Sequence, residues 1–596
     1  MPKKTNKRMY LTTLTAKTLL ILATVGIISS SQPLTSMAQH GYSPVDVANT
    51  VGDITLDSLL LKVSFRNALA AGEFGSDHFT DPDGMRALYE EKGNMPFWLG
   101  ESFSHPRIEA LLNVFQDSWK HGLNPEHYHA TEIRRLLRHP LQDEQAKLEL
   151  LVSDAVIRYG EDMTGMRIDP EAIRQNPDYW RKPMRGYDVL EKVVDAEDPA
   201  AALESLTPKG RLYASLQDEL ETLVTKTTDY DYLLPIEVNS NYFKPGQNSP
   251  AIPKLRERLG LQYDPSYGPE TKYDDPLAAE VMKFQAEHGL EPDGILGPNT
   301  MALINRTHKD MIEQVIANLE RLRWLDQDRP DRYVLVNIPS ATVWGVEHGQ
   351  VKLEMPVVVG MSYRPTKSFK TEITGVRFNP TWTVPLRLKW EDILPKVKED
   401  VSYLDDKGIE LFKGYGKNAI SLDPHAINWD KMTWQELAKI RMVQVPGDHN
   451  ALGRIRVLMP NPYNIYMHDT NHKEYFARTA RNYSSGCIRL SRPKDMARFI
   501  MRAKNDWSDS KMNEYLADNI THDIEVDEKM PVYILYQTMW LDNEGKLVFG
   551  HDVYKQDRKL IKALANIDGY YIPPVPSALL AKADHPEDRD SLASSR

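Results

Sequence analysis

The sequence predicts a multidomain α+β protein with a helical N-terminal region and a β-rich C-terminal domain. Apolar residues recur at helical spacing over about residues 45–235, and three short helices punctuated by glycine follow over about 240–308. From Arg332 to about residue 540 the pattern changes to short β-rich runs. A chain of 596 residues, 41% of them hydrophobic, is long enough to form several domains with cores of their own.

The first 38 residues have the pattern of a signal peptide. Residues 19–28 are mostly apolar, and Ser36-Met37-Ala38 places small residues at the two positions that a signal peptidase reads. The basic residues of the segment are Lys3, Lys4, Lys7, Arg8 and Lys17. The apolar run is short for a membrane span. We therefore expect export to the periplasm, with an uncleaved inner-membrane anchor as the alternative.

The charge of the chain argues against nucleic acid as a partner. The formal net charge is −11, and loss of five basic residues with the signal segment changes it to −16. Nucleic-acid binding needs a basic footprint, which so acidic a protein lacks. We therefore expect no nucleic-acid partner.

The region 45–235 is expected to be a helical scaffold domain. Residues 106–119 and 148–163 carry apolar residues at helical spacing, and the turn at 122–125 ends one helix. The region contains no pattern of residues that suggests catalysis.

The region 240–308 is expected to be a small three-helix module. Its characteristic residues are Phe284-Gln285, Gly289-Leu290, Asp293-Gly294, Gly297 and Thr300. This order resembles the peptidoglycan-binding type 1 module. The resemblance implies binding to the cell wall, and two alternatives stay open: the residues only build caps and turns, or the module is a spacer that has lost ligand binding.

The region 332–540 is expected to be the catalytic domain. The strands expected are 333–338, 342–346, 351–359, 375–378, 455–459 and 531–536. The block 386–440 breaks this pattern with helical pieces and is expected to be an inserted lid over the site. Residues 572–596 are rich in Pro, Asp and Ser, which predicts a disordered tail.

The single cysteine of the chain, Cys487, is the strongest functional signal. An exported protein with one cysteine cannot form an internal disulfide, so the thiol is either reactive or paired with another molecule. Residues 483–490 read Tyr-Ser-Ser-Gly-Cys-Ile-Arg-Leu, and residues 463–470 form a predicted strand that carries His468 near its end. We interpret Cys487 as a nucleophile.

These two segments together resemble the L,D-transpeptidase (YkuD-type) catalytic domain. The hallmark of that family is a histidine–threonine segment followed by Ser-x-Gly-Cys-x-Arg. Three further segments, 378–385, 444–447 and 450–453, match its long periplasmic branch. Two positions depart from the family pattern: Asp469 stands where many members have glycine, and Lys367 stands where relatives often have proline.

Chemical reasoning gives each candidate residue a role. A free cysteine is only a few per cent thiolate at neutral pH, so His468 is expected to act as its general acid/base. The amides of Gly486 and Cys487 are candidate oxyanion donors, with the Tyr466 hydroxyl as a further candidate. Candidate substrate-binding residues are Ser485, Arg489 and Asp469. As alternatives, Arg489 only braces the loop and Ser485 only supplies a hydrogen bond within it.

The resemblance implies a two-step acyl transfer on peptidoglycan peptide stems. Cys487 attacks the carbonyl of the L-centre of meso-diaminopimelate and expels D-Ala, and a second diaminopimelate amine resolves the acyl-enzyme as a 3→3 cross-link. Water as the acceptor would make the enzyme an L,D-carboxypeptidase, and a D-amino acid or a lipoprotein lysine would make it an exchange or anchoring enzyme. No cofactor is expected, carbapenems are expected to acylate the thiol, and other wall-synthesis enzymes are possible partners in building the wall and cell shape.

Two hypotheses from other classes remain. His468, His472 and Cys487 can be read as three zinc ligands, but the two histidines have helical spacing within a predicted strand, so we expect no metal. The other is a non-catalytic wall-binding scaffold in which Cys487 is inert.

Overall fold

The computed structural model describes residues 66–74, 77–99, 105–138, 144–230, 235–238, 240, 242–568 and 573. The expected signal peptide (1–38) lies outside these residues, as does the expected tail (572–596) apart from residue 573. None of the helices described there has the length and apolarity that a membrane crossing requires.

The N-terminal region is helical, as its apolar spacing predicts. Its helices are α2 (Pro82–Glu91), α3 (Pro106–Asp117), α4 (Ala130–Arg138), α5 (Gln145–Thr164), α6 (Gly186–Val194), α7 (Pro199–Glu204) and α8 (Arg211–Tyr230), preceded by the short strands β1 (Glu73–Phe74) and β2 (Asp77–His78). Helix α5 is buried around most of its circumference, so the other helices pack around it. Aspartates cap α2 and α7, where the side chains of Asp81 and Asp198 accept backbone N–H groups.

A buried carboxyl group on α5 fixes the segment that follows α2. Glu149 is fully buried and accepts hydrogen bonds from the backbone of residues 97–99 and from the Tyr89 hydroxyl, the last at 2.8 Å. Burial raises the pKa of Glu149 to about 7, while these donors oppose the rise. Glu149 therefore has a structural role, which is to hold residues 97–99 against α5.

The small module has the three helices expected. They are α9 (Ile252–Arg258), α10 (Asp275–Glu287) and α11 (Pro298–Ile304). Their apolar faces share one core that includes Ile252, Leu255, Leu277 and Val281. A buried ion pair joins Arg256 to Asp274, the residue that caps α10, at 2.6 Å.

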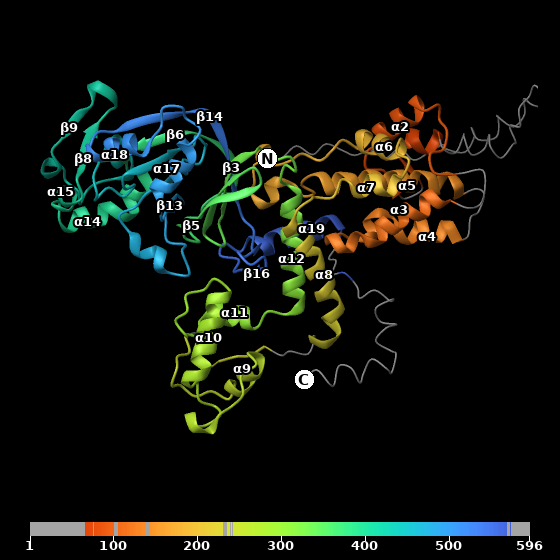
Figure 1. Cartoon of the computed structure of the whole chain (residues 1–596), viewed down its shortest axis with the longest axis horizontal. Coiled ribbons are helices and arrows are strands. Elements are labelled where there is room, and N and C mark those ends of the chain that lie inside the picture. The colour runs from red at the N-terminus through yellow and green to blue at the C-terminus, as the bar shows by residue number, and fades with distance from the viewer. Residues whose placement is uncertain are drawn as a thin grey trace, which may run out of the picture. The chain divides into compact units, whose positions relative to one another are not determined.

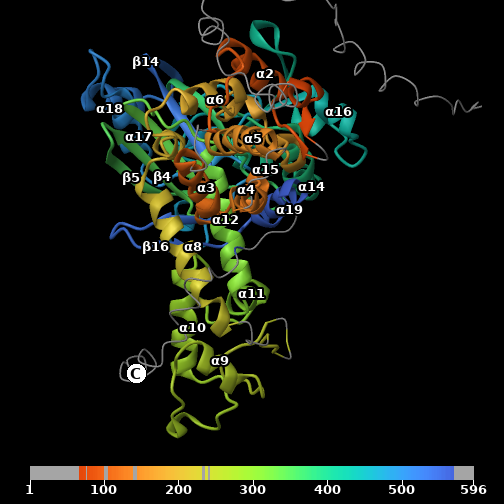
Figure 2. The same cartoon turned by 90° about the vertical axis from the view of Figure 1, so that its right-hand side faces the viewer.

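Helix α12 (His308–Arg323) leads from the module into the C-terminal domain and packs along α8, as Figures 1 and 2 both show. The shared core includes Leu216 and Leu220 of α8 and Ile312 and Leu319 of α12. At the end of α12 the fully buried Arg323 and Glu320 form an ion pair at 2.6 Å.

The C-terminal domain is a closed eight-stranded barrel in the order β11-β12-β13-β5-β4-β3-β14-β6. The strands are β3 (Arg332–Asn337), β4 (Thr342–Glu347), β5 (Gln350–Val358), β6 (Phe369–Phe378), β11 (Ile455–Leu458), β12 (Met467–His468), β13 (Ile488–Leu490) and β14 (His522–Leu535). Two pairs are parallel, β12 with β13 and β14 with β3, and the others are antiparallel. The predicted β-rich domain is confirmed.

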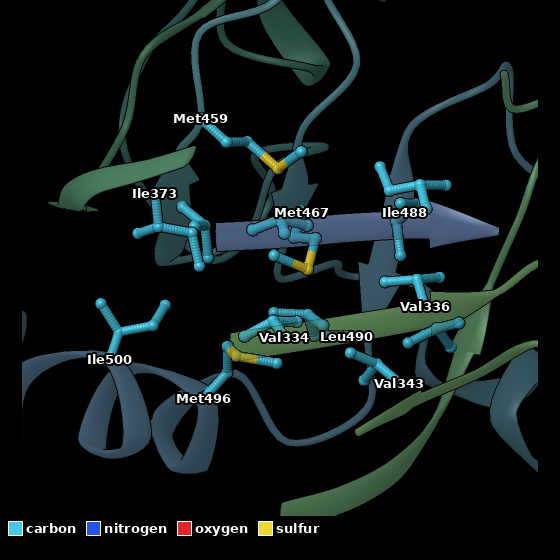
Figure 3. Packing of buried hydrophobic residues seen from close by; sticks show 14 of the residues in the cluster. Val334, Val336, Val343, Ile373, Met459, Met467, Ile488, Leu490, Met496 and Ile500 are labelled. Carbon is cyan, nitrogen blue, oxygen red and sulfur yellow. The ribbon is translucent and has the colours of Figure 1, made fainter. Parts of the chain in front are cut away.

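Alternation along each strand separates the barrel interior from its outer face. Figure 3 shows Met467, Ile488 and Leu490 gathered with Val334 and Val336 of β3. Helix α17 (Pro493–Met501) contributes further apolar side chains to this cluster. The remaining elements are α18 (Asp509–Ala517), β15 (Met539–Leu541), β16 (Leu547–Phe549) and α19 (Gln556–Asp568). Because residues 467, 488 and 490 point inward, their neighbours at 466, 468, 487 and 489 face outward.

The inserted block is helical only in part, which corrects the expectation of a helical lid. Its helical pieces are α13 (Leu386–Leu388), the short π-helix η7 (Lys389–Ile393), α14 (Leu394–Glu399), α15 (Tyr403–Asp406) and α16 (Trp434–Lys439). A four-stranded sheet joins them, in the order β7 (Trp382–Thr383), β10 (Ile440–Gln444), β8 (Ile409–Lys413) and β9 (Ile420–Leu422). These strands are only two to five residues long, and β10 pairs with β7 and β8, which are distant from it in sequence, so local periodicity did not reveal the sheet. The block has its own apolar core, which includes Leu394, Leu411 and Met442.

The ion pair at the end of α12 gives a test of the fold. Arg323→Met should lower the free energy of unfolding by about 3–5 kcal/mol, because Glu320 would remain buried without its counter-charge. Urea unfolding followed by tryptophan fluorescence measures the change. Arg134→Met on the exposed face of α4 is the control and should change stability little. Equal stability of Arg323→Met and the wild type would contradict this role.

Candidate active site

The outer face of three neighbouring strands brings the candidate residues together. In the parallel pair of β12 with β13, Met467 lies opposite Ile488 and His468 opposite Arg489. On the other side of β12, His468 lies opposite Arg456 of β11. Tyr466 and Cys487 precede the paired residues, so one polar face of the barrel wall carries the thiol, the imidazole, the phenol and two guanidinium groups.

The loop that presents Cys487 is held by backbone bonds to the segment after β5. The Ser484 amide donates to the Val359 carbonyl at 2.8 Å, and the Met361 amide donates to the Ser484 carbonyl at 2.9 Å. The Thr366 hydroxyl donates to the Gly486 carbonyl at 2.8 Å. Gly486 has φ +115°, a conformation that residues with a side chain rarely adopt. Glycine is therefore favoured immediately before Cys487.

The expectation that the Gly486 amide serves as an oxyanion donor is not supported. Its N–H donates to the Ser484 hydroxyl at 3.1 Å, and that hydroxyl in turn donates to the Cys487 carbonyl at 2.5 Å. The Gly486 donor is thus occupied within the loop. The Cys487 amide makes no hydrogen bond to any of the described residues, and it is the remaining backbone candidate.

The Cys487 thiol lies between a carbonyl and a phenol. Its Sγ is 3.8 Å from the Asn464 carbonyl oxygen, and Asn464 has φ +52°, a left-handed conformation that directs this carbonyl. The Tyr466 hydroxyl lies close enough to Sγ and to the Trp382 indole for both to affect its pKa. Burial raises the pKa of the Cys487 thiol although Tyr466 and nearby arginines oppose the rise. Burial also raises the pKa of Tyr466, so the phenol keeps its proton.

His468 is almost fully buried, and its ring is oriented by the backbone. Its Nδ1 is hydrogen bonded to the carbonyl of Asp469. Because a carbonyl only accepts, the neutral ring carries its proton on Nδ1 and leaves Nε2 as the basic nitrogen. Burial and the nearby Arg489 lower the pKa of His468 to about 3. Among the described residues no hydrogen bond joins Sγ to the imidazole, and Sγ contacts the Asn464 carbonyl instead.

The carboxylate of Asp469 supports the loop around the histidine. It accepts the backbone amides of Arg454 at 2.9 Å and Thr470 at 2.7 Å and contacts the Lys473 ammonium. A Cβ atom on Gly453, where φ is +59°, would lie 2.4 Å from the Asp469 carboxyl carbon. The carboxylate is thus committed to protein partners, and the expectation that Asp469 binds substrate is not supported.

Two arginines leave donors free beside the thiol. Arg456 Nε and Arg489 Nη1 are buried and have no hydrogen-bond partner within the described part of the chain. The Arg456 guanidinium lies 4.0 Å from the centroid of the Tyr466 ring, and that of Arg489 lies 5.7 Å from the Tyr475 ring. Unpaired guanidinium groups favour binding of a carboxylate. Sequence reasoning missed Arg456, although a charge within the apolar strand Ile455–Leu458 was the available signal.

Ser485 connects the loop that carries Cys487 to the inserted block. Its hydroxyl accepts from Arg364 Nη1 at 3.0 Å, and Arg364 also pairs with Asp392 at 2.7 Å and with Glu391. Hydrogen bonds to these two carboxylates raise the pKa of Arg364, and its partial burial opposes the rise without cancelling it. Ser485 itself is exposed next to Cys487. The free protein therefore uses its hydroxyl as a loop contact.

The signature residues of the small module are occupied in holding the module together. The Gln285 side chain donates to Asp293, the Ile295 carbonyl and Thr300, each at 3.0 Å, and accepts from the Gly294 amide at 2.9 Å. This contact set agrees with the interpretation that these residues build turns.

The zinc hypothesis finds no set of ligands. His472 Nδ1 lies 2.9 Å from Glu474 Oε1, and the described residues contain no cluster of three metal-ligating side chains.

Comparison with known proteins agrees with this domain organisation. Family models match residues 83–220 ("Scaffold domain"), 249–304 ("Putative peptidoglycan binding domain") and 331–534 ("L,D-transpeptidase catalytic domain"). The chain thus carries an L,D-transpeptidase catalytic domain joined to a scaffold domain and a module of the peptidoglycan-binding type.

A curated relative of the same class is the "Putative L,D-transpeptidase" of Haemophilus influenzae. It is 31% identical over 261 residues, which cover 44% of this chain and 51% of that protein. The chain thus matches about half the length of this relative.

Solved structures with distant similarity include L,D-transpeptidases of Mycobacterium smegmatis and Mycobacterium tuberculosis. They are 13% and 14% identical, cover 34% of this chain and 58% and 61% of their own, and have TM-scores of 0.18 and 0.16. Scores this low add nothing to the interpretation of the site.

The pKa shifts predict how the free thiol reacts. Because the pKa of Cys487 is raised, its alkylation by iodoacetamide should speed up about tenfold per pH unit from pH 6 to 8. His468 stays neutral over this range, since its pKa is about 3, so no step is expected near pH 6.5. Cys487 is the only cysteine, so Cys487→Ala supplies the blank. A plateau below pH 8 would instead indicate a preformed thiolate.

Proposed function

We propose that this protein is an exported L,D-transpeptidase that acts in the periplasm on the tetrapeptide stems of peptidoglycan. Cys487 is the nucleophile and His468 the general acid/base, and the product is a 3→3 cross-link between two diaminopimelate residues. The observation that carries the proposal is the placement of Cys487, Tyr466 and His468 with two partly unpaired arginines on one outer face of the barrel. The match of residues 331–534 to the L,D-transpeptidase catalytic domain supports it.

In the first step, Sγ of Cys487 attacks the carbonyl carbon at the L-centre of meso-diaminopimelate while His468 Nε2 takes the thiol proton. The carbonyl π pair moves to oxygen, where the Cys487 amide is the available backbone donor. The C–N bond to D-Ala then breaks, and the imidazolium returns the proton to the departing amine. A thioester on Cys487 and free D-Ala result.

In the second step, the side-chain amine of another diaminopimelate attacks the thioester. His468 accepts a proton from that amine and gives it to the departing sulfur, so the thiol is restored and an amide bond is formed. No net redox change occurs, and the chain's own residues supply every proton transfer.

The resting site holds a neutral thiol beside a neutral imidazole. Burial disfavours the charged form of each, since it raises the pKa of Cys487 and lowers that of His468. Proton transfer therefore accompanies attack on the substrate, when negative charge has moved from sulfur toward the acyl oxygen. A thiol kept protonated is also less open to oxidation in an oxidising compartment.

Arg456 and Arg489 are proposed to receive a carboxylate of the peptide stem. Their free buried nitrogens lie beside the thiol, and each contributes to stabilising negative charge on Cys487. Peptide stems carry carboxylates at D-Ala and at the D-centre of diaminopimelate, so a cationic wall matches the substrate in charge.

The acceptor can differ without a change in the first step. Water would give an L,D-carboxypeptidase, whereas a D-amino acid or a lipoprotein amine would give exchange or anchoring. The alternative from another class is a non-catalytic wall-binding scaffold. Its prediction is that Cys487→Ala keeps all biological activity while binding to the wall persists.

Product analysis tests the reaction. Purified protein incubated with disaccharide-tetrapeptide should release D-Ala and yield cross-linked dimers, identified by mass spectrometry, and a carbapenem should add its mass to Cys487. Cys487→Ala should abolish these products. Ser485→Ala is the matched control from the same loop and should keep at least about a tenth of the activity, since it loses only a hydrogen bond from Arg364, which remains paired with Asp392. Absence of D-Ala release by the wild type would refute the proposal.

A second experiment tests the arginine wall. Arg456→Gln should lower kcat/KM about 10- to 100-fold, because a hydrogen bond to a charged group contributes about 1.5–3 kcal/mol. Arg377→Gln is the control: Arg377 lies opposite Arg456 in the ladder but is already paired with Asp523 at 2.5 Å. Equal kinetics for the two variants would remove Arg456 from substrate binding.

A further inference from the structure

A tyrosine beyond the matched catalytic domain reaches the turn that follows β5. Residues 331–534 match the family model, and Tyr554 lies after them, just before helix α19. The Tyr554 hydroxyl donates to the Gly360 carbonyl at 2.6 Å and accepts from the Thr366 amide at 3.3 Å. One side chain of the C-terminal segment thus holds the two ends of the turn 360–366 together.

Burial keeps this contact well defined. Thr366 is 0% exposed and Tyr554 is 8% exposed. The Tyr554 ring stacks on that of Tyr536 with 5.5 Å between centroids, and the Tyr536 hydroxyl accepts from the Tyr554 amide at 2.8 Å. Burial raises the pKa of Tyr554 to about 12, so its hydroxyl keeps its proton at neutral pH and remains a donor.

Thr366 connects the turn to the peptide group between Gly486 and Cys487. Its hydroxyl accepts from the Gly360 amide at 2.9 Å and donates to the Gly486 carbonyl at 2.8 Å. The Gly486 carbonyl and the Cys487 N–H belong to one planar peptide group, so a bond that fixes the carbonyl also fixes the direction of the N–H. That N–H is the remaining backbone candidate for the oxyanion donor.

We propose that Tyr554 is a positioning residue, which acts through Thr366 to set the orientation of the Cys487 N–H. The inference rests on the proposed function, in which this N–H stabilises the oxyanion of acyl transfer. Among the hydrogen bonds of the described residues, none joins Tyr554 directly to Gly486 or Cys487, so its effect is transmitted by the turn. The functional unit therefore extends past β14 into the C-terminal segment.

The single cysteine allows a direct measurement on this peptide group. When the full chain is deuterated and labelled with nitrogen-isotope-enriched cysteine, its one labelled amide is that of Cys487, and two-dimensional NMR records the resonance. Tyr554→Phe and Thr366→Val should each shift it by more than the line width, because each removes a hydroxyl from the chain of bonds. Thr366→Ser keeps the hydroxyl and should shift it less than Thr366→Val does.

Thr521→Val is the matched control for the NMR measurement. It removes a hydroxyl that donates to the Asn379 carbonyl at 2.7 Å in the same domain, and it should leave the Cys487 resonance in place. An unchanged resonance in either Tyr554→Phe or Thr366→Val would overturn the proposal.

Kinetics measures the consequence for the reaction. Thr366→Val should lower kcat for D-Ala release about 10- to 100-fold and Tyr554→Phe about 3- to 30-fold, with KM within about twofold, because oxyanion donors act in the transition state. Alkylation of Cys487 by iodoacetamide forms no oxyanion, so its rate should stay within about twofold. A similar loss in both rates would indicate general disruption of the loop and would refute the positioning role.

The double variant Tyr554→Phe/Thr366→Val tests whether the two residues act in series. Its kcat should lie within about threefold of that of Thr366→Val alone, because changes in one chain of contacts are not additive. Losses that multiply would indicate independent roles and would refute the proposal. Absence of D-Ala release by the wild type would refute the proposed function instead, and the Cys487 resonance would still decide whether Tyr554 orients the peptide group.

Discussion

The proposed chemistry depends on the parallel pairing of β12 with β13. This register sets Met467 against Ile488 inside the barrel, so Tyr466 and Cys487 are directed to the outer face. A slip of one residue would bury the polar set and expose the apolar one, so the apolar core fixes the register strongly. The geometry of the site is thus a consequence of core packing, and the loop bonds from the segment after β5 only refine it.

Burial of the site determines how its charges are handled. The same low-dielectric surroundings raise the pKa of Cys487 and lower that of His468, so the resting pair is uncharged. Arg456 and Arg489 supply positive charge nearby and retain donors without partners. In the proposed mechanism, charge develops in the site only when substrate binds.

Sequence patterns predicted the fold class because each domain has a strong local signal. Glycine-punctuated helices marked the module, and alternating strands such as Ile455–Leu458 marked the barrel. The sheet of the inserted block was missed because its strands are short and its inner strand β10 pairs with β7 and β8, which are distant from it in sequence. For the same reason the motif predicted Cys487 and His468 as a pair but not Arg456 or Trp382, which reach the site from other strands. The Gly486 amide is occupied because the rotamer of Ser484 places its hydroxyl within reach, and no sequence pattern specifies that rotamer.

The proposed mechanism requires His468 to remove the thiol proton as Cys487 attacks the substrate. Rapid-quench mass spectrometry with a tetrapeptide substrate measures the rate at which the thioester forms on Cys487. In His468→Gln this rate should fall at least about 100-fold, in the range expected for loss of a general base. Thioester formation at the wild-type rate in that variant would contradict the account.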